Sequence, residues 1–117
     1  MGINFRHSVR SKAAWSYSGF NIFRERLARQ IGLEPVAMAD WGGDREWPDP
    51  KQEPIIHLLH HSDCDDVIAH AHCAAVAKRL RELVANWDHR DYDRQAALLL
   101  AESMEEAAAA RSDLDFC

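Results

Sequence analysis

Two long stretches with helical periodicity, separated by a short polar turn, constrain the fold of this chain most. The first runs from about Asp66 to Trp87 and the second from about Tyr92 to Ala110, with the turn at Asp88–Asp91. Their apolar stripes contain Val76, Leu80, Leu83, Val84 and Trp87 in the first and Ala97, Leu100, Met104 and Ala107 in the second. Because a one-sided apolar stripe must be buried against another element, the pattern predicts packed helices.

Shorter helical segments precede this pair. A helix is expected to begin near Ser18, whose hydroxyl can cap the first turn, and to end at Gly32, which can adopt the left-handed conformation. Further short helices are expected at Pro35–Asp40 and at Pro54–His61, since proline suits the first helical position. We therefore expect a mainly α fold, a small helical bundle of about four helices.

The two ends of the chain have a different pattern. Ile3–His7 alternates apolar and polar residues, as a strand does, and Leu114–Cys117 alternates in the same way. The N- and C-terminal segments are therefore expected to form a short β pair. Neither a repeat nor a linker interrupts the sequence, so residues 1–117 are predicted to form a single globular domain.

No segment predicts membrane insertion or secretion. The apolar runs, among them Leu98–Ala101 and Ala107–Ala110, are far shorter than the ~20 residues of a membrane span. The first residues lack the apolar region of a signal peptide. We expect a cytoplasmic protein without a membrane partner.

The charge is distributed unevenly along the chain. Residues 1–30 carry six basic residues and one acidic residue, whereas the whole chain has a net charge of −5. The basic third indicates either a surface that binds nucleic acid or arginines that neutralise the protein's own acidic surface. We prefer the second explanation, because nucleic-acid-binding domains are usually more basic. The residues that would bind nucleic acid are Arg6, Arg10, Arg24, Arg26 and Arg29.

Histidine and cysteine are concentrated in one short region. Five of the seven histidines and two of the three cysteines lie between residues 57 and 73. His57 and His61, four residues apart on an expected helix, could bind one metal ion. The candidate Zn²⁺ ligands are His57, His61, Cys64 and Cys73, with His72 as an alternative to Cys73.

Simpler explanations compete with zinc. The spacing matches no standard zinc module, and buried cysteines with helix-capping or surface histidines would give the same pattern. The acidic turn at residues 63–66 resembles the start of a calcium loop, but the later ligand positions are missing. Cys64 beside a histidine has neither a recognisable third group nor an oxyanion hole. We therefore expect that the protein is not an enzyme and holds no cofactor. A domain stabilised by zinc is the alternative.

The segment Leu33–Glu53 is the second place to look for a binding surface. It is rich in proline and glycine, and loops of this length are often functional. Loop aromatics can anchor a protein partner, although they can equally cover the core of a small domain. The candidate partner-binding residues are Trp15, Tyr17, Trp41 and Trp47.

Four short stretches carry a family resemblance. They are Trp15–Phe20 (WSYSGF), Phe23-Arg24, His61–Asp65 (HSDCD) and the terminal Phe116-Cys117. Through them the chain resembles small proteins predicted in actinobacteria and their phages, over nearly its whole length. No activity is known for that family, so the resemblance implies a bacterial or phage origin and no functional residues.

The sequence as a whole favours a non-enzymatic protein-binding module with an accessory, inhibitor or immunity-like role. The acidic composition, the tryptophan-bearing loop and the lack of a catalytic motif support this hypothesis. The alternatives are a zinc-stabilised domain and a nucleic-acid-binding protein.

Overall fold

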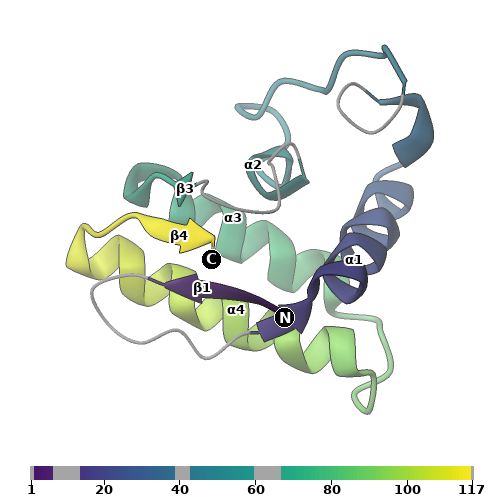
Figure 1. Cartoon of the computed structure of the whole chain (residues 1–117). Helices are drawn as coiled ribbons and strands as arrows, with labels where there is room; N and C mark the ends of the chain where they lie inside the picture. The colour runs from purple at the N-terminus through teal and green to yellow at the C-terminus, as the bar shows by residue number, and fades with distance from the viewer. Residues whose placement is uncertain (1, 7–13, 39–42, 60–66, 117) are drawn as a thin grey trace.

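The computed structural model describes residues 2–6, 14–38, 43–59 and 67–116, and it is mainly helical, as predicted (Figure 1). The helices are α1 (Tyr17–Gln30), the 3-10 helix η1 (Pro35–Ala37), α2 (Ile56–Leu59), α3 (His70–Val84) and α4 (Tyr92–Ala110). The strands are β1 (Gly2–Arg6), β2 (Ala14–Ser16), β3 (Val67–Ile68) and β4 (Leu114–Phe116).

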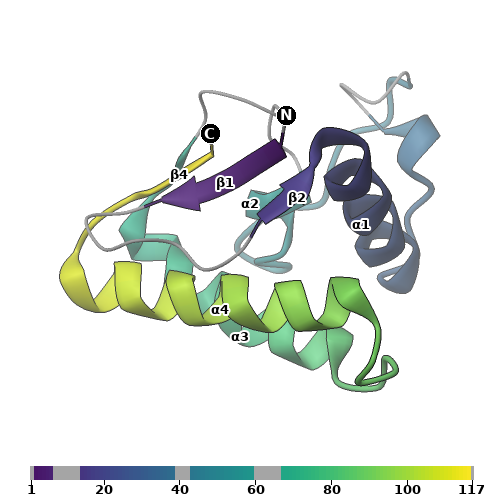
Figure 2. The same ribbon diagram turned by 60° about the horizontal axis from the view of Figure 1, so that its bottom comes forward.

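Helices α3 and α4 lie side by side and form the base of the fold (Figures 1 and 2). The apolar stripes predicted for them are buried, except that Trp87 is only partly buried. Small side chains let the two helices approach closely, because alanine leaves room for the facing ridge. The buried alanines on this pair are Ala77, Ala96, Ala97, Ala101 and Ala107.

The four strands form a sheet in the order β2-β1-β4-β3, and each neighbouring pair is antiparallel. In β1, Phe5 lies opposite Phe116 of β4, and on the other edge of β4 Leu114 lies opposite Ile68. Figure 2 shows the strands along one side of the α3–α4 pair. Ile68 and Leu114 are fully buried in the common core.

The start of α3 differs from the sequence prediction. A helix was expected from about Asp66, but Val67 and Ile68 form strand β3, and α3 begins at His70. Two interactions distant in sequence explain the difference. β3 pairs with β4, and the Asp113 carboxylate accepts a hydrogen bond of 2.9 Å from the backbone N–H of His70. Asp113 therefore caps α3 from 43 residues away.

The predicted stop of α1 is confirmed at Gly32, whose φ of 85° lies in the left-handed region. The 3-10 helix η1 is shorter than the predicted Pro35–Asp40 helix, and Arg45 N–H donates to Ala37 O at 3.0 Å. A β-carbon at Gly43 would lie 2.2 Å from the Ala37 carbonyl, so this close approach requires glycine.

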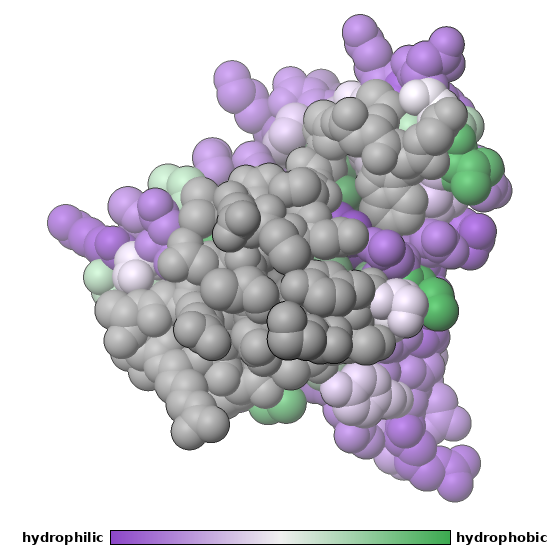
Figure 3. All heavy atoms as spheres, in the orientation of Figure 1, coloured by the Kyte–Doolittle hydropathy of each residue, from purple (hydrophilic) through white to green (hydrophobic). Residues whose placement is uncertain are grey.

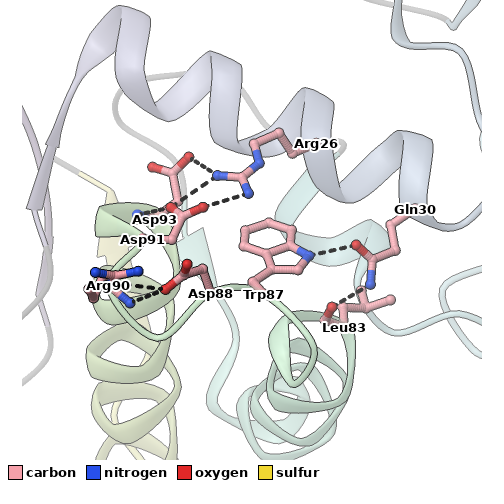
Figure 4. A network of polar contacts seen from close by, with 8 residues as sticks. All are labelled: Arg26, Gln30, Leu83, Trp87, Asp88, Arg90, Asp91 and Asp93. Carbon is pink, nitrogen blue, oxygen red and sulfur yellow. Dashed lines mark hydrogen bonds and ion pairs between the residues drawn. The ribbon is translucent and has the colours of Figure 1, made fainter.

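Helix α1 is held against the α3–α4 turn by Arg26 (Figure 4). The Arg26 guanidinium lies 2.8 Å from carboxylate oxygens of both Asp91 and Asp93, and 3.8 Å from the Trp87 ring centroid. Trp87 Nε1 donates to Gln30 Oε1 at 2.7 Å, and the Gln30 amide donates to the Leu83 carbonyl. Three separate elements therefore meet at one cation.

Within the described residues, no helix is both long enough and apolar enough to cross a bilayer. The longest of them, α4, carries several charged side chains along its length.

We predict that Arg26→Gln lowers the free energy of unfolding by about 1–2 kcal/mol, because it removes the cation–π contact and leaves two carboxylates without their cation. Urea denaturation followed by circular dichroism measures the change. Arg81→Gln is the control, because Arg81 pairs with Glu105 on the exposed surface. Its expected cost is below about 0.5 kcal/mol, and equal losses in the two variants would contradict the role of Arg26.

We also predict an acid-dependent contribution from Asp113. Hydrogen bonds from the His70 backbone and side chain lower the pKa of Asp113. A carboxyl group whose pKa is lower in the folded state stabilises the protein at pH values above its unfolded pKa of about 3.9. This stabilisation is lost as the pH falls through the folded-state pKa. The difference in unfolding free energy between the wild type and Asp113→Ala should therefore shrink between about pH 5 and pH 3. A difference that stays constant over this range would contradict the assignment.

Candidate functional site

A half-open pocket of about 400 Å³ lies between the turn that precedes α2 and the first turns of α3. Its volume is in the range of ligand-binding pockets, and its lining is mostly apolar. The lining residues are Asp49, Pro50, Lys51, Pro54, His57, His72 and Ala75. The pocket therefore joins the two regions that the sequence marked for binding, the proline-rich segment and the histidine cluster.

The turn that forms one wall is fixed by its own hydrogen bonds. Asp49 Oδ1 accepts from the backbone N–H of Lys51 at 2.9 Å, and Asp49 O accepts from Gln52 N and Glu53 N at 2.9 and 3.0 Å. Aspartate commonly caps a turn in this way, and Pro50 fixes the following φ angle. The wall is therefore built by local sequence.

Glu53 attaches this turn to α3. Its carboxylate makes a two-point ion pair with Arg79, with Nε–Oε1 at 2.8 Å and Nη2–Oε2 at 3.0 Å. The hydrogen bond to Glu53 is the main cause that raises the pKa of Arg79. Glu53 Oε1 also accepts from Ile55 N at 3.4 Å, and Glu53 O accepts from Ile56 N at 3.1 Å. One residue thus positions the turn, α2 and α3 together.

Two histidine rings form the opposite side of the pocket. His57 on α2 and His72 on α3 stack with their centroids 4.1 Å apart and their planes 16° apart. His72 is exposed, whereas His57 is half-buried. The stack presents flat aromatic surface together with ring nitrogens that donate or accept hydrogen bonds according to their tautomer.

The predicted zinc ligands are not all brought together on the described chain. Cys73 is fully buried, its thiol lies 3.7 Å from the Ile68 carbonyl oxygen, and burial raises its pKa to about 11. Successive helical residues point about 100° apart, so Cys73 faces the core while His72 faces His57. His61 and Cys64 lie outside the described residues. Among the residues that are described, no three side chains are grouped to hold a metal ion, and the complete zinc set stays a prediction.

The predicted aromatic anchors are distributed over several elements. Trp47 is half-buried and packs against the core. Trp15 lies in β2 opposite Ile3, Tyr17 is the first residue of α1, and Trp41 lies outside the described residues. Trp47 therefore covers the core, which was the alternative explanation for a loop tryptophan.

The arginines proposed for nucleic-acid binding are largely engaged with the protein itself. Arg24 is 3% exposed and donates to Asn21 Oδ1 at 2.6 Å. Arg26 binds the acidic turn before α4, and Arg29 pairs with Glu25 at 3.7 Å and Glu34 at 3.6 Å. Arg6 lies in β1, and Arg10 lies outside the described residues. This arrangement favours internal charge neutralisation over a phosphate-binding surface.

Elsewhere in the described chain, few large apolar side chains are exposed, and they lie on α1, η1 and α4. Figure 3 shows that the coloured part of this face is mainly hydrophilic, with small separate apolar areas. The large apolar residues that are exposed in the described chain are Ile22, Val36, Tyr92 and Leu99. The pocket, which combines apolar walls with charged and aromatic groups, is therefore the better candidate site.

Asp49, Pro50 and Lys51 lie in the segment Leu33–Glu53 that was expected to bind a partner, but neither they nor Pro54 were predicted as individual site residues. The Asp49-Pro50 pair is a turn signal, and proline before α2 was recognised as a helix start. Neither signal indicates that the turn lies beside His72 on α3. The turn is held against α3 by the ion pair between Glu53 and Arg79, which are far apart in the sequence.

We predict that Glu53→Gln loosens the pocket wall, because a neutral amide cannot make the two-point ion pair with Arg79. The free energy of unfolding should fall by about 1–2 kcal/mol, and the amides of residues 51–59 should exchange with deuterium faster than in the wild type. Glu105→Gln, which removes an exposed pair with Arg81, is the matched control. Unchanged exchange in Glu53→Gln would show that the ion pair does not hold the wall.

Comparison with protein-family models, with curated proteins and with solved structures finds no match for this chain.

Proposed function

We propose that this chain is a non-enzymatic module that binds another protein through the pocket between residues 49–54 and the His57–His72 stack. The observation that carries the proposal is a pocket with apolar lining whose walls are fixed by hydrogen bonds and an ion pair within the chain itself. Preformed walls favour binding because less conformational entropy is lost when the partner docks.

The chemistry of the pocket is suited to a protein segment. Pro50, Pro54 and Ala75 offer apolar contacts, while the imidazoles and the charged rim offer hydrogen bonds. Binding sites commonly combine a mainly apolar lining with a few polar groups that fix orientation. The thiol of Cys73 is buried and its raised pKa keeps it protonated at neutral pH, so the proposal assigns it a packing role.

The proposal also includes the origin and setting expected from the sequence. We place the module in the cytoplasm of a bacterium or in its phage, as an accessory, inhibitor or immunity-like protein. The pairing of the N- and C-terminal segments is part of the same proposal, and the antiparallel register between β1 and β4 supports it.

We predict that Ala75→Trp abolishes partner binding, because the larger side chain fills the pocket from the exposed surface of α3. Ala74→Trp is the matched control, since Ala74 is the exposed neighbour that does not line the pocket. Tagged forms of the wild type and both variants are used for affinity capture from the native host, with quantitative mass spectrometry of bound proteins.

We expect that one protein is captured by the wild type and by Ala74→Trp. The captured amount of this protein should be about tenfold or more lower with Ala75→Trp. A partner retained equally by both variants would place binding elsewhere. Circular dichroism confirms that each variant is folded before capture.

A further inference from the structure

Lys51 is an exposed residue that lines the pocket and carries a positive charge. Among the described residues its ammonium group has no ion-pair or hydrogen-bond partner. The arginines at positions 26, 79 and 81 each have a carboxylate oxygen within 2.8 Å. A cation without a partner, next to apolar walls, is complementary to a ligand that joins an anion to an apolar group.

Asp49 adds a second polar contact to the same rim. One of its carboxylate oxygens, Oδ1, accepts the Lys51 backbone N–H at 2.9 Å, and a carboxylate has further acceptor positions. The rim therefore offers an acceptor from Asp49 and a cation from Lys51. A ligand that fits both carries an N–H donor and an anion on either side of an apolar group.

We propose that the pocket binds the C-terminal residue of the partner protein. The terminal carboxylate pairs with the Lys51 ammonium, the backbone N–H of that residue donates to the Asp49 carboxylate, and its apolar side chain lies against Pro50, Pro54 and the histidine stack. This inference rests on the proposed function and names the chemistry of the segment that the partner presents.

A chain terminus fits better than an internal acidic residue. In a terminal residue the carboxylate, the N–H group and the side chain all leave from one Cα atom or its direct neighbours. In an extended internal segment, successive side chains point to opposite faces, so an acidic residue and its apolar neighbour point apart. A half-open pocket of about 400 Å³ suits one such residue rather than a long segment.

The experiment is an NMR titration of the ¹⁵N-labelled full chain at low salt. The probes are N-acetyl-L-phenylalanine, which carries the carboxylate, and N-acetyl-L-phenylalanine amide, which lacks it. Backbone signals of residues 49–57 and of His72 report binding. We expect saturable shifts with millimolar affinity and about fivefold or more tighter binding of the acid than of the amide, as for a hydrogen bond to a charged group.

Two lysine variants give the matched comparison. Lys51→Gln should remove the preference for the acid, whereas Lys78→Gln should keep it, because Lys78 is an exposed lysine of α3 that does not line the pocket. The amide probe tests the same charge contact in the wild-type chain, so the inference does not depend on one variant. N-acetyl-aspartate α-amide, with its carboxylate on the side chain, should bind more weakly than the terminal acid.

Each result supports or overturns the inference. Equal affinity for the acid and the amide overturns terminal recognition, while partner binding that still depends on Ala75 keeps the proposed function. Absence of shifts around the pocket with either probe also overturns it. Preference for the side-chain carboxylate of the aspartate probe would assign the pocket to an internal acidic residue instead. If Lys78→Gln loses the preference for the acid over the amide as fully as Lys51→Gln does, the preference reflects the overall charge of the protein, and the inference is overturned.

Discussion

The close packing of α3 against α4 is the constraint on which the remaining structure depends. Both helices bury a continuous apolar stripe, and alanines at the contact let them approach closely. Every other described element that positions the pocket is fixed relative to α3. Helix α2 is attached through Glu53 and Arg79, and β3 leads directly into the first turn that carries His72.

Charged residues act mainly as connections within this protein. Arg26 joins α1 to the turn before α4, Arg79 joins the proline-rich turn to α3, and Asp113 caps α3. The ion pairs of Arg26 and Arg79 are partly buried and multiply bonded, and such pairs stabilise more than single surface pairs do. The uneven charge along the sequence is therefore explained in part by Arg26, a basic residue near one end that meets acidic residues near the other. Lys51 differs because the described structure gives its ammonium no partner.

Elements specified by local sequence were predicted well. Helix α4 occupies the predicted range from Tyr92 to Ala110, because Asp91 caps its start through Asp93 N–H and the alanines favour helix. The end of α1 at Gly32 follows in the same way from a glycine that adopts a positive φ. These signals lie within a few residues of the feature that they determine.

Features that depend on distant partners were not predicted. Val67 and Ile68 continue a helical pattern in the sequence, but their pairing with β4 makes them a strand. From the sequence, His72 was considered only as an alternative metal ligand. Its stacking on His57 was not predicted, because it depends on how α2 is attached to α3. The sequence also does not show that Cys73 faces the core while its neighbour faces the pocket. The zinc set itself stays a prediction, because His61 and Cys64 lie outside the described residues.

The proposed pocket depends on the His57 ring being stacked on the His72 ring. The most direct measurement is the nuclear Overhauser effect between the imidazole protons of these two residues in the free protein at neutral pH. The account predicts clear cross-peaks between the two rings, because their centroids are 4.1 Å apart. Absence of these cross-peaks, with both rings assigned and α3 intact, would contradict a preformed site.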